Sequence, residues 1–201
     1  MLKRMFDVVL SGAGIIASSP LWLLFAIVIK LEDGGPVFFR QDRVGRGGRV
    51  FSALKFRSMR PDAEAGRGAV QADERDERVT RIGRVMRATA MDELPQLWSI
   101  LRGDMSFVGP RALRPGEIEA GSDGRLVALE DVPGYEQRIT VRPGLTGIAQ
   151  IYAPRDIPRR HKFRYDRIYI AKRSWMLDLR LILLSFWISF RGTWESRGRK
   201  Y

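Results

Sequence analysis

The sequence predicts an α+β protein: a small, helix-rich, membrane-associated domain with a short β-hairpin. Residues 8–29 form an uncharged apolar run near the start of the chain. Two strand-like segments flank a glycine-rich turn at 45–48, and apolar residues recur at helical spacing in later segments. We therefore expect a membrane helix over 1–32, followed over 33–201 by a globular domain that carries interfacial amphipathic helices.

The composition limits the kinds of site that the chain can hold. At 201 residues it is long enough for one domain with a core. It lacks cysteine, and its single histidine, His161, argues against a histidine metal site or a Ser-His-Asp triad. The net charge of +12 suggests a polyanionic partner, such as nucleic acid, an anionic membrane or a phosphate-bearing substrate. The alternative is a merely basic soluble protein.

The apolar run is long enough to cross a bilayer, because 22 residues of helix reach about 33 Å. Pro20 lies in its middle, and proline bends a helix. Basic residues flank the run, Lys3 and Arg4 before it and Lys30 after it, so both ends favour the cytoplasm. These residues alone fit a kinked spanning helix and a hairpin that re-emerges on the same side equally well.

A β-hairpin is expected next. Pro36 to Arg40 and Val50 to Lys55 have strand character around the turn at 45–48. Lys55 and Arg57 would then lie on one face of an extended segment. Contact with phosphate groups and plain solvation explain these two charges equally well.

Two segments of different character follow the hairpin. Residues 61–78 are polar and predict a loop or a short exposed helix. The segment 79–86 leads onward with Arg81, Arg84 and Arg87 at a spacing of three, which predicts one basic helical face. That face suits lipid headgroups or a nucleotide diphosphate, and ordinary solvation is the alternative.

A short amphipathic helix is expected in the middle of the chain. Apolar residues recur at helical spacing from Leu94 to Leu101, and Gly103 is the expected stop. Since proline is tolerated only in the first turn of a helix, Pro95 places Asp92 and Glu93 at or just before its start.

The adjacent acids Asp92 and Glu93 are the candidate centre. Acidic residues at a helix start commonly serve only to cap its amides, and the same amides form a natural anion site. Arg87 precedes the pair, and Gly109-Pro110-Arg111 follows it. A carboxylate pair flanked by arginines suits phosphate chemistry, in which carboxylates hold Mg²⁺ or attack phosphorus while arginines grip phosphate oxygens.

The remaining chain supplies four more expected elements. Residues 112–132 predict an acidic helix or loop, and 142–147 form a turn whose glycines permit close backbone approach to a ligand. A basic helix is expected over 159–173. The apolar, aromatic segment 179–190 is too short to span a bilayer, so it is a helix at the membrane interface or a buried core helix.

Several blocks, in this order and over nearly the whole chain, resemble the bacterial sugar transferases called monotopic phosphoglycosyl transferases. The blocks are Lys3-Arg4-Met5-Phe6-Asp7, Ser19-Pro20, Gly35-Pro36-Val37-Phe38-Phe39-Arg40-Gln41, Lys55-Phe56-Arg57-Ser58-Met59, Arg81-Ile82-Gly83-Arg84, Asp92-Glu93-Leu94-Pro95-Gln96, Gly103-Asp104-Met105-Ser106 with Val108-Gly109-Pro110-Arg111, and Arg142-Pro143-Gly144-Leu145-Thr146-Gly147-Ile148-Ala149-Gln150. Two places depart from the family pattern. Ala112 replaces a usual proline, and the usual Gly-Arg after Gln150 is missing, so that only Arg155 can serve there.

The resemblance implies a monotopic enzyme on the cytoplasmic face of the bacterial inner membrane, with a re-entrant helix set by Ser19 and Pro20. It implies transfer of a phospho-sugar from a UDP-sugar to polyprenol (undecaprenyl) phosphate, with release of UMP, as the first membrane step of glycan or exopolysaccharide assembly. Mg²⁺ is the implied cofactor, with Asp92 and Glu93 as its expected ligands. Our hypothesis makes Asp92 the nucleophile that forms an aspartyl-phosphosugar, and Glu93 its assistant.

The candidate substrate-binding residues are mostly basic. They are Lys55, Arg57, Arg87, Arg111, Arg142, Gln150 and Arg155. Among them we expect Arg87 and Arg111 to clamp phosphates, because a guanidinium matches phosphate oxygens in geometry and charge. Arg155 bears on the choice of sugar if its segment touches the substrate.

Two other functions compete with this one. A membrane-tethered scaffold that binds polyanions would be indifferent to loss of Asp92 and Glu93, but no nucleic-acid motif is recognised and we expect no nucleic-acid partner. A glycosyltransferase that moves the sugar alone would release UDP instead of UMP. The sequence does not determine the sugar, the glycan pathway, or whether the chain is a monomer or a homodimer.

Overall fold

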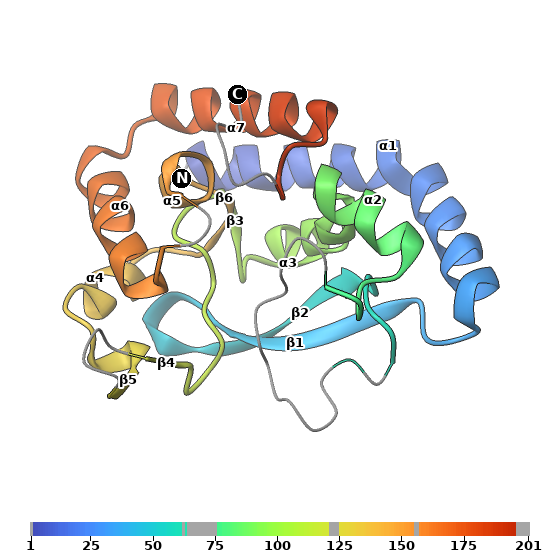
Figure 1. Ribbon diagram of the computed structural model, residues 1–201. Helices are drawn as coiled ribbons and strands as arrows, with labels where there is room; N and C mark the ends of the chain where they lie inside the picture. The colour runs from blue at the N-terminus through green and yellow to red at the C-terminus, as the bar shows by residue number, and fades with distance from the viewer. Residues whose placement is uncertain (1, 62, 64–75, 121–124, 155–156, 196–201) are drawn as a thin grey trace.

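The computed structural model describes residues 2–61, 63, 76–120, 125–154 and 157–195. It is a mixed structure of helices and small sheets, as predicted. The helices are α1 (Leu2–Asp33), α2 (Arg81–Thr89), α3 (Gln96–Arg102), α4 (Tyr135–Ile139), α5 (Ile148–Tyr152), α6 (Arg159–Lys172) and α7 (Trp175–Arg191). The strands are β1 (Phe38–Val44), β2 (Val50–Phe56), β3 (Ser106–Val108), β4 (Ile118–Ala120), β5 (Leu126–Ala128) and β6 (Gly144–Thr146). Helices α1 and α7 run along one side, the β1–β2 hairpin lies on the opposite side, and α3 lies between them (Figure 1).

Helix α1 is a single continuous helix that bends part-way along (Figure 1). Within the described residues it alone is long and apolar enough to cross a membrane. Pro20 has no amide to donate to the carbonyl oxygen of Ile16, four residues back. The hydroxyl of Ser19 donates to that oxygen instead, at 2.8 Å. The Ser-Pro pair therefore allows a bend without leaving a backbone acceptor unpaired.

The first turns of α1 are bound to the rest of the chain. The Arg4 guanidinium donates to the backbone carbonyls of Ile100 and Leu101 in α3, at 2.6 and 2.7 Å. The buried carboxylate of Asp7 accepts bonds of 3.1 Å from a hydroxyl and a backbone amide at the start of β3. Lys3 forms an ion pair with Asp178 of α7. Lys3 and Arg4 thus act inside the fold as well as adding charge at the helix start.

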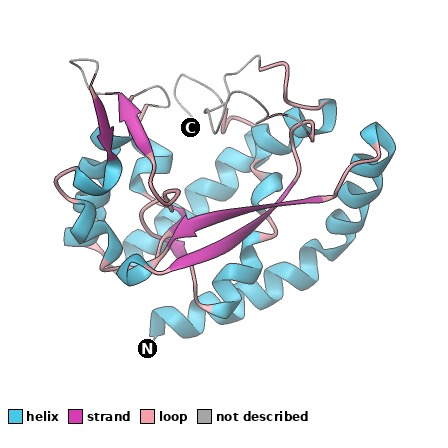
Figure 2. Cartoon of the chain, turned by 90° about the horizontal axis from the view of Figure 1, so that it is seen from below, coloured by secondary structure: helices cyan, strands magenta, loops and turns pink. Residues whose placement is uncertain are grey.

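The predicted β-hairpin is confirmed. Strands β1 and β2 pair antiparallel from Phe38 opposite Phe56 to Val44 opposite Val50. The turn between them contains Gly47 with a φ of 68°, a value that favours glycine. Seen from below, the hairpin lies across the helices (Figure 2). Phe56 is almost fully buried, and it packs against α1 in a cluster with Phe25, Ile29 and Met86.

Gly144 lies at a place where two backbone segments come very close. Strand β6 pairs parallel with β3 there. A Cβ atom on Gly144 would lie 2.0 Å from the amide nitrogen of Gly109, and one on Gly109 would lie 2.4 Å from the carbonyl oxygen of Arg142. These two glycines therefore admit a neighbouring backbone next to the Gly-Pro-Arg segment. The expected close approach of a ligand to 142–147 stays a prediction.

The prediction of an acidic helix or loop over 112–132 is wrong at 118–120 and 126–128, where strands β4 and β5 form a small antiparallel hairpin. One acid of β4 has a long-range role: the Glu119 carboxylate accepts bonds from the amides of Arg159 (2.6 Å) and Arg160 (3.2 Å). Glu119 therefore caps the first amides of α6, a contact that no local pattern reveals.

Helix α7 packs in the core on one side, as one alternative predicted, and leaves aromatic side chains exposed. Leu181 and Ile188 are fully buried in the core. Phe186, Trp187 and Phe190 are exposed on its other side. The basic helix expected over 159–173 is present as α6, and the basic helix with Arg81 and Arg84 is present as α2. Most of the predicted polar loop, at 62 and 64–75, lies outside the described residues.

Candidate active site

Asp92 and Glu93 lie in a turn of 3-10 helix, Met91–Glu93, between α2 and α3. Ala90 ends α2 in the left-handed region, with a φ of 57°, and this reverses the chain. The predicted position just before a helix is confirmed. The predicted anion site is not, because the amides of Glu93 and Leu94 donate to carbonyl oxygens of the same turn, at 3.1 and 3.2 Å.

Two cations hold Glu93. The Lys55 ammonium, on β2, contacts carboxylate oxygen Oε1 of Glu93. The Arg111 guanidinium, after β3, donates to the same oxygen at 3.1 Å. Burial alone would raise the pKa of Glu93, but the two cations outweigh burial and hold that pKa well below its usual range. The same contact raises the pKa of Arg111. Glu93 is therefore ionised at every pH of interest.

Asp92 has the opposite electrostatic character. It is buried, and desolvation raises its pKa to about 6. The positive charge of Lys55 opposes this rise, and the negative charge of Glu93 adds to it. Two adjacent carboxylates therefore differ in acidity, with Glu93 fixed in an ion-pair network and Asp92 poised near neutral pH.

The acid pair faces a cavity of about 790 Å³, a size that suits a sizeable ligand. One wall is polar and contains Lys55, Arg87, Asp92, Glu93, Arg111, Gln150 and Arg159. The other wall is apolar, with Leu10, Ala13, Gly14 and Ala17 from α1 and Ile182 and Phe186 from α7. The cavity therefore joins a side rich in cations to an apolar side.

The structure brings four of the seven predicted substrate-binding residues together around the acid pair. Lys55, Arg87, Arg111 and Gln150 line the cavity with the acid pair. Arg57 does not: its buried guanidinium pairs with Asp33 and donates to the Pro36 carbonyl at 2.5 Å.

 Arg142 does not line the cavity either: its backbone lies against Gly109, and its guanidinium donates to the Gly103 carbonyl at 2.7 Å. Arg155 lies outside the described residues.

Arg87 occupies the end of the cavity nearest the close of α7. Its guanidinium lies 3.4 Å from the carboxylate of Glu195. Its positive charge also lowers the pKa of Asp92, although less than Lys55 does, so it acts on the acid pair as well. Arg87 is therefore placed between the acid pair and a third carboxylate.

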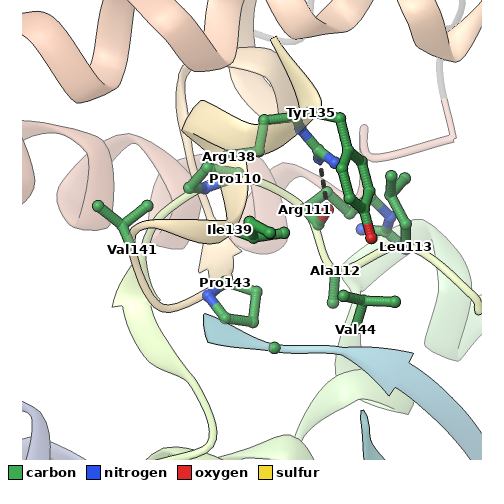
Figure 3. A pocket seen from close by; sticks show the side chains of 11 residues that line it. Val44, Pro110, Arg111, Ala112, Leu113, Tyr135, Arg138, Ile139, Val141 and Pro143 are labelled. Carbon is green, nitrogen blue, oxygen red and sulfur yellow. Dashed lines mark hydrogen bonds between the residues drawn. The ribbon is translucent and has the colours of Figure 1, made fainter. Parts of the chain in front are cut away.

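A buried ion pair behind Arg111 was not assigned to the site from the sequence. Arg138 of α4 pairs with Asp166 of α6 at 2.7 Å, and its other nitrogen donates to the Arg111 carbonyl at 2.7 Å (Figure 3). Burial raises the pKa of Asp166, and Arg138 opposes that rise. The spacing of Asp166 from the basic start of α6 was the one sequence signal for it. The small pocket beside this contact, of about 20 Å³, holds little more than a water molecule (Figure 3).

The acid pair suits Mg²⁺. No group of three or more histidine, cysteine or acidic residues with metal-site geometry occurs in the part of the chain that the structure describes. Mg²⁺ is commonly held by one or two carboxylates together with substrate phosphates. Asp92 and Glu93 are the two carboxylates that could hold the ion here, and substrate phosphates would be its further ligands.

Comparison with known proteins identifies the family of this chain. A sequence-family model described as "Bacterial sugar transferase" matches residues 1–192. The exopolysaccharide production protein PSS of Rhizobium leguminosarum bv. phaseoli is 41% identical over 187 residues, which cover 90% of this chain and 92% of the relative. The UDP-glucose:undecaprenyl-phosphate glucose-1-phosphate transferase of Caulobacter vibrioides is 42% identical over 186 residues, covering 90% and 67%.

A third relative is longer than this chain. The UDP-N-acetylgalactosamine-undecaprenyl-phosphate N-acetylgalactosaminephosphotransferase of Aeromonas hydrophila is 40% identical over 184 residues, which cover 90% of this chain but 42% of the relative. The residues that the family model matches, 1–192, include the acid pair, the β1–β2 hairpin, Arg87 and Arg111. This chain belongs to the bacterial sugar transferase family.

Proposed function

We propose that this protein transfers a phospho-sugar from a UDP-sugar to polyprenol phosphate and releases UMP. The names of the Caulobacter and Aeromonas relatives, which pair a UDP-sugar with undecaprenyl phosphate, support this activity. The name of the Rhizobium relative supports a place in exopolysaccharide production. The relatives differ in the sugar that they are named for, so both UDP-glucose and UDP-N-acetylgalactosamine are donors to test.

The observation that carries the proposal is the two-sided cavity around the acid pair. The phosphates of the donor and of the acceptor need cations, which Lys55, Arg87 and Arg111 supply. An acceptor with a polyprenyl chain needs apolar surface, which α1 and α7 supply. Asp92 lines the same cavity as both groups of residues, so one carboxylate can serve as the point where the two substrates meet.

The proposed chemistry has two displacements at one phosphorus atom. The Asp92 carboxylate attacks the sugar-bearing phosphorus of the donor, and the bond from that phosphorus to the bridging oxygen breaks, which releases UMP. A phosphate oxygen of the acceptor then attacks the same phosphorus, and the bond to Asp92 breaks, which frees the carboxylate. Neither step requires a proton to be removed from the nucleophile, which suits a chain with one histidine.

The surrounding residues position the phosphates. Lys55 and Arg111 hold Glu93 ionised beside Asp92 and face the cavity themselves. Arg138 fixes the backbone of Arg111, so its guanidinium is presented in one place. Mg²⁺, held by Asp92 and Glu93, would supply neutralisation of charge on the phosphate oxygens and the leaving group. Phosphoryl transfer depends mainly on such positioning and electrostatic stabilisation.

We also propose that the exposed apolar faces of α1 and α7 lie in the membrane, with the acid pair at the level of the lipid phosphates. Val9, Ile16 and Leu23 on α1 are exposed, as are Met176 and Phe190 on α7. Together these side chains form an apolar surface next to the apolar wall of the cavity, larger than soluble monomers usually expose. We further propose that α1 re-emerges on the cytoplasmic side of the inner membrane.

The test uses purified protein, polyprenol phosphate, Mg²⁺ and each UDP-sugar in turn. The expected nucleotide product is UMP, and incubation with the UDP-sugar alone should leave phospho-sugar bound to Asp92, detectable by intact-protein mass. Release of UDP would instead identify a transferase that moves the sugar without its phosphate. Full activity in Asp92→Asn would rule out the covalent route, and full activity after removal of divalent ions would rule out the role of Mg²⁺.

A further inference from the structure

The chain after α7 folds back over one end of the cavity. Gly192 ends α7 with a φ of 63°. The backbone amide of Trp194 donates to the Ala88 carbonyl in α2 at 3.1 Å, and its indole N–H donates to the Ser189 hydroxyl at 2.8 Å. We call residues 193–195 the C-terminal strap. These two hydrogen bonds fix the strap against α2 and place Glu195 in the cavity wall.

Glu195 lies where an anionic ligand of Arg87 would lie. Its carboxylate is 3.4 Å from the Arg87 guanidinium, and the two side chains are 29% and 19% exposed. Carboxylates and phosphates compete for the same face of a guanidinium, because both accept hydrogen bonds from its nitrogens. An ion pair as open to water as this one is weak, so an incoming phosphate can replace it.

Arg87 lies beside α7, which supplies part of the apolar wall of the cavity, and this position favours the acceptor phosphate over the donor diphosphate. Arg87 lies at the α2 side of the cavity, beside the end of α7, whereas α4 and α6 border the opposite side (Figure 1). Lys55 and Arg111 hold Glu93, and Arg138 backs Arg111. A phosphate monoester also carries up to two negative charges near neutral pH, so it competes better with a carboxylate than a singly charged phosphate does.

We propose that Glu195 is an internal occupant of the Arg87 site and that the phosphate of polyprenol phosphate displaces it. Arg87 then exchanges a carboxylate for a phosphate, with no covalent change. The C-terminal strap thereby sets the affinity for the acceptor. This inference rests on the proposed function, because it assigns one of the two substrates of that reaction to Arg87.

The test is Glu195→Gln, which keeps the size of the side chain and removes its charge. Transfer through a covalent intermediate makes kcat/KM for each substrate independent of the other. We expect kcat/KM for polyprenol phosphate to rise by about twofold to fivefold, the range that a weak ion pair allows. We expect kcat/KM for the UDP-sugar to stay unchanged. Glu136→Gln, at an exposed position on α4, is the matched control and should alter neither value.

A double variant isolates the pair. In an Arg87→Ala background, Glu195→Gln should have no effect on kcat/KM for the acceptor, because the competed-for cation is absent. A fall in kcat/KM for the acceptor in the single variant would overturn the proposal, since Glu195 would then orient Arg87 for catalysis. An unchanged value, or a rise confined to the UDP-sugar, would overturn it as well.

Binding separates this inference from the proposed function. If the wild-type protein transfers no phospho-sugar from any UDP-sugar, the proposed function fails. The occupant is then tested by the rise in Tm that polyprenol phosphate produces in detergent, compared between wild type and Glu195→Gln. A larger rise in the variant supports the competition, and an equal or smaller rise overturns it.

Discussion

The Arg111 guanidinium lies 3.1 Å from oxygen Oε1 of Glu93, the same oxygen that the Lys55 ammonium contacts. Both cations therefore pair with one member of the acid pair, Glu93. Glu93 remains ionised, and Asp92 is left as the carboxyl whose pKa is raised, to about 6. The distinct roles proposed for these adjacent acids follow from this unequal sharing of positive charge.

The first prediction concerns pH. Asp92 attacks as a carboxylate, and burial raises its pKa to about 6, so activity should fall as pH drops through that value. We expect kcat/KM for the UDP-sugar to be constant above about pH 7 and to fall about tenfold per pH unit well below pH 6. UDP-sugar is the substrate to vary, because the acceptor phosphate also titrates near pH 6. Constant kcat/KM down to pH 4.5 would contradict the raised pKa.

The second prediction concerns Lys55. Its positive charge lowers the pKa of Asp92, so Lys55→Met should move the acid limb of kcat/KM for the UDP-sugar above pH 6. Loss of a phosphate-facing cation should also reduce kcat/KM on the plateau by about 10²-fold to 10³-fold. Lys172→Met, at an exposed position on α6, is the control and should change neither. A plateau loss without movement of the acid limb would show that Lys55 does not influence Asp92.

Local patterns predict the elements of this fold better than their partners. The helix stop at Gly103 follows from backbone chemistry and agrees with the structure, whereas Pro95 lies at the N-cap of α3, just before the first turn in which it was expected. The hairpin likewise follows from alternation and a glycine turn. By contrast, β4 and β5 were expected to be a helix or loop. Glu119 of β4 contacts the start of α6 about 40 residues away, and a contact at that distance gives no pattern in the local sequence.

In the candidate site, too, the sequence indicates which residues are involved better than it indicates their contacts. Lys55 and Arg57 differ by two positions and were expected on one face, yet Lys55 reaches Glu93 while Arg57 pairs with Asp33. Strand β2 ends at Phe56, so the alternation that the prediction assumed stops before Arg57. The Arg138–Asp166 pair lies hidden for another reason: its partners are on different helices, and only tertiary packing brings them together.

The third prediction is that Asp92→Asn inactivates the protein and stabilises its fold. Keeping a buried carboxylate charged costs folding free energy at pH values above its raised pKa. An increase in pKa from the ordinary value to about 6 corresponds to at most about 3 kcal/mol. Asp92→Asn should therefore raise the free energy of unfolding at pH 8 and lose that advantage below about pH 4. Urea unfolding at both pH values measures it, and an equal gain at both would contradict the assignment to charge.

The fourth prediction concerns the Arg138–Asp166 pair, whose side chains are 6% and 3% exposed. Asp166→Asn leaves a buried guanidinium without its counter-charge, which should lower the free energy of unfolding by about 3–5 kcal/mol. Because Arg138 also holds the Arg111 carbonyl, kcat should fall while the protein is still folded. Asp104→Asn breaks the exposed pair with Arg102 and should cost less than about 1 kcal/mol. Equal losses in the two variants would contradict the special role of the buried pair.

The last prediction is that both ends of α1 lie on the same side of the membrane. Arg4 in its first turn is bound to carbonyls of α3, and Glu32 in its last turn accepts a bond of 2.6 Å from the Arg81 amide at the start of α2. A helix that crossed the bilayer would have to break one of these contacts.

The chain has no cysteine, so Leu2→Cys and Leu31→Cys each introduce one exposed thiol, and Ser52→Cys on the hairpin marks the side of the globular domain. We expect a membrane-impermeant maleimide to label all three in inverted vesicles and none in intact cells whose outer membrane has been made permeable. Labelling of Leu2→Cys and Leu31→Cys from opposite sides would show that α1 spans the bilayer, and the acid pair would then lack the interfacial position on which the transfer to a lipid phosphate depends.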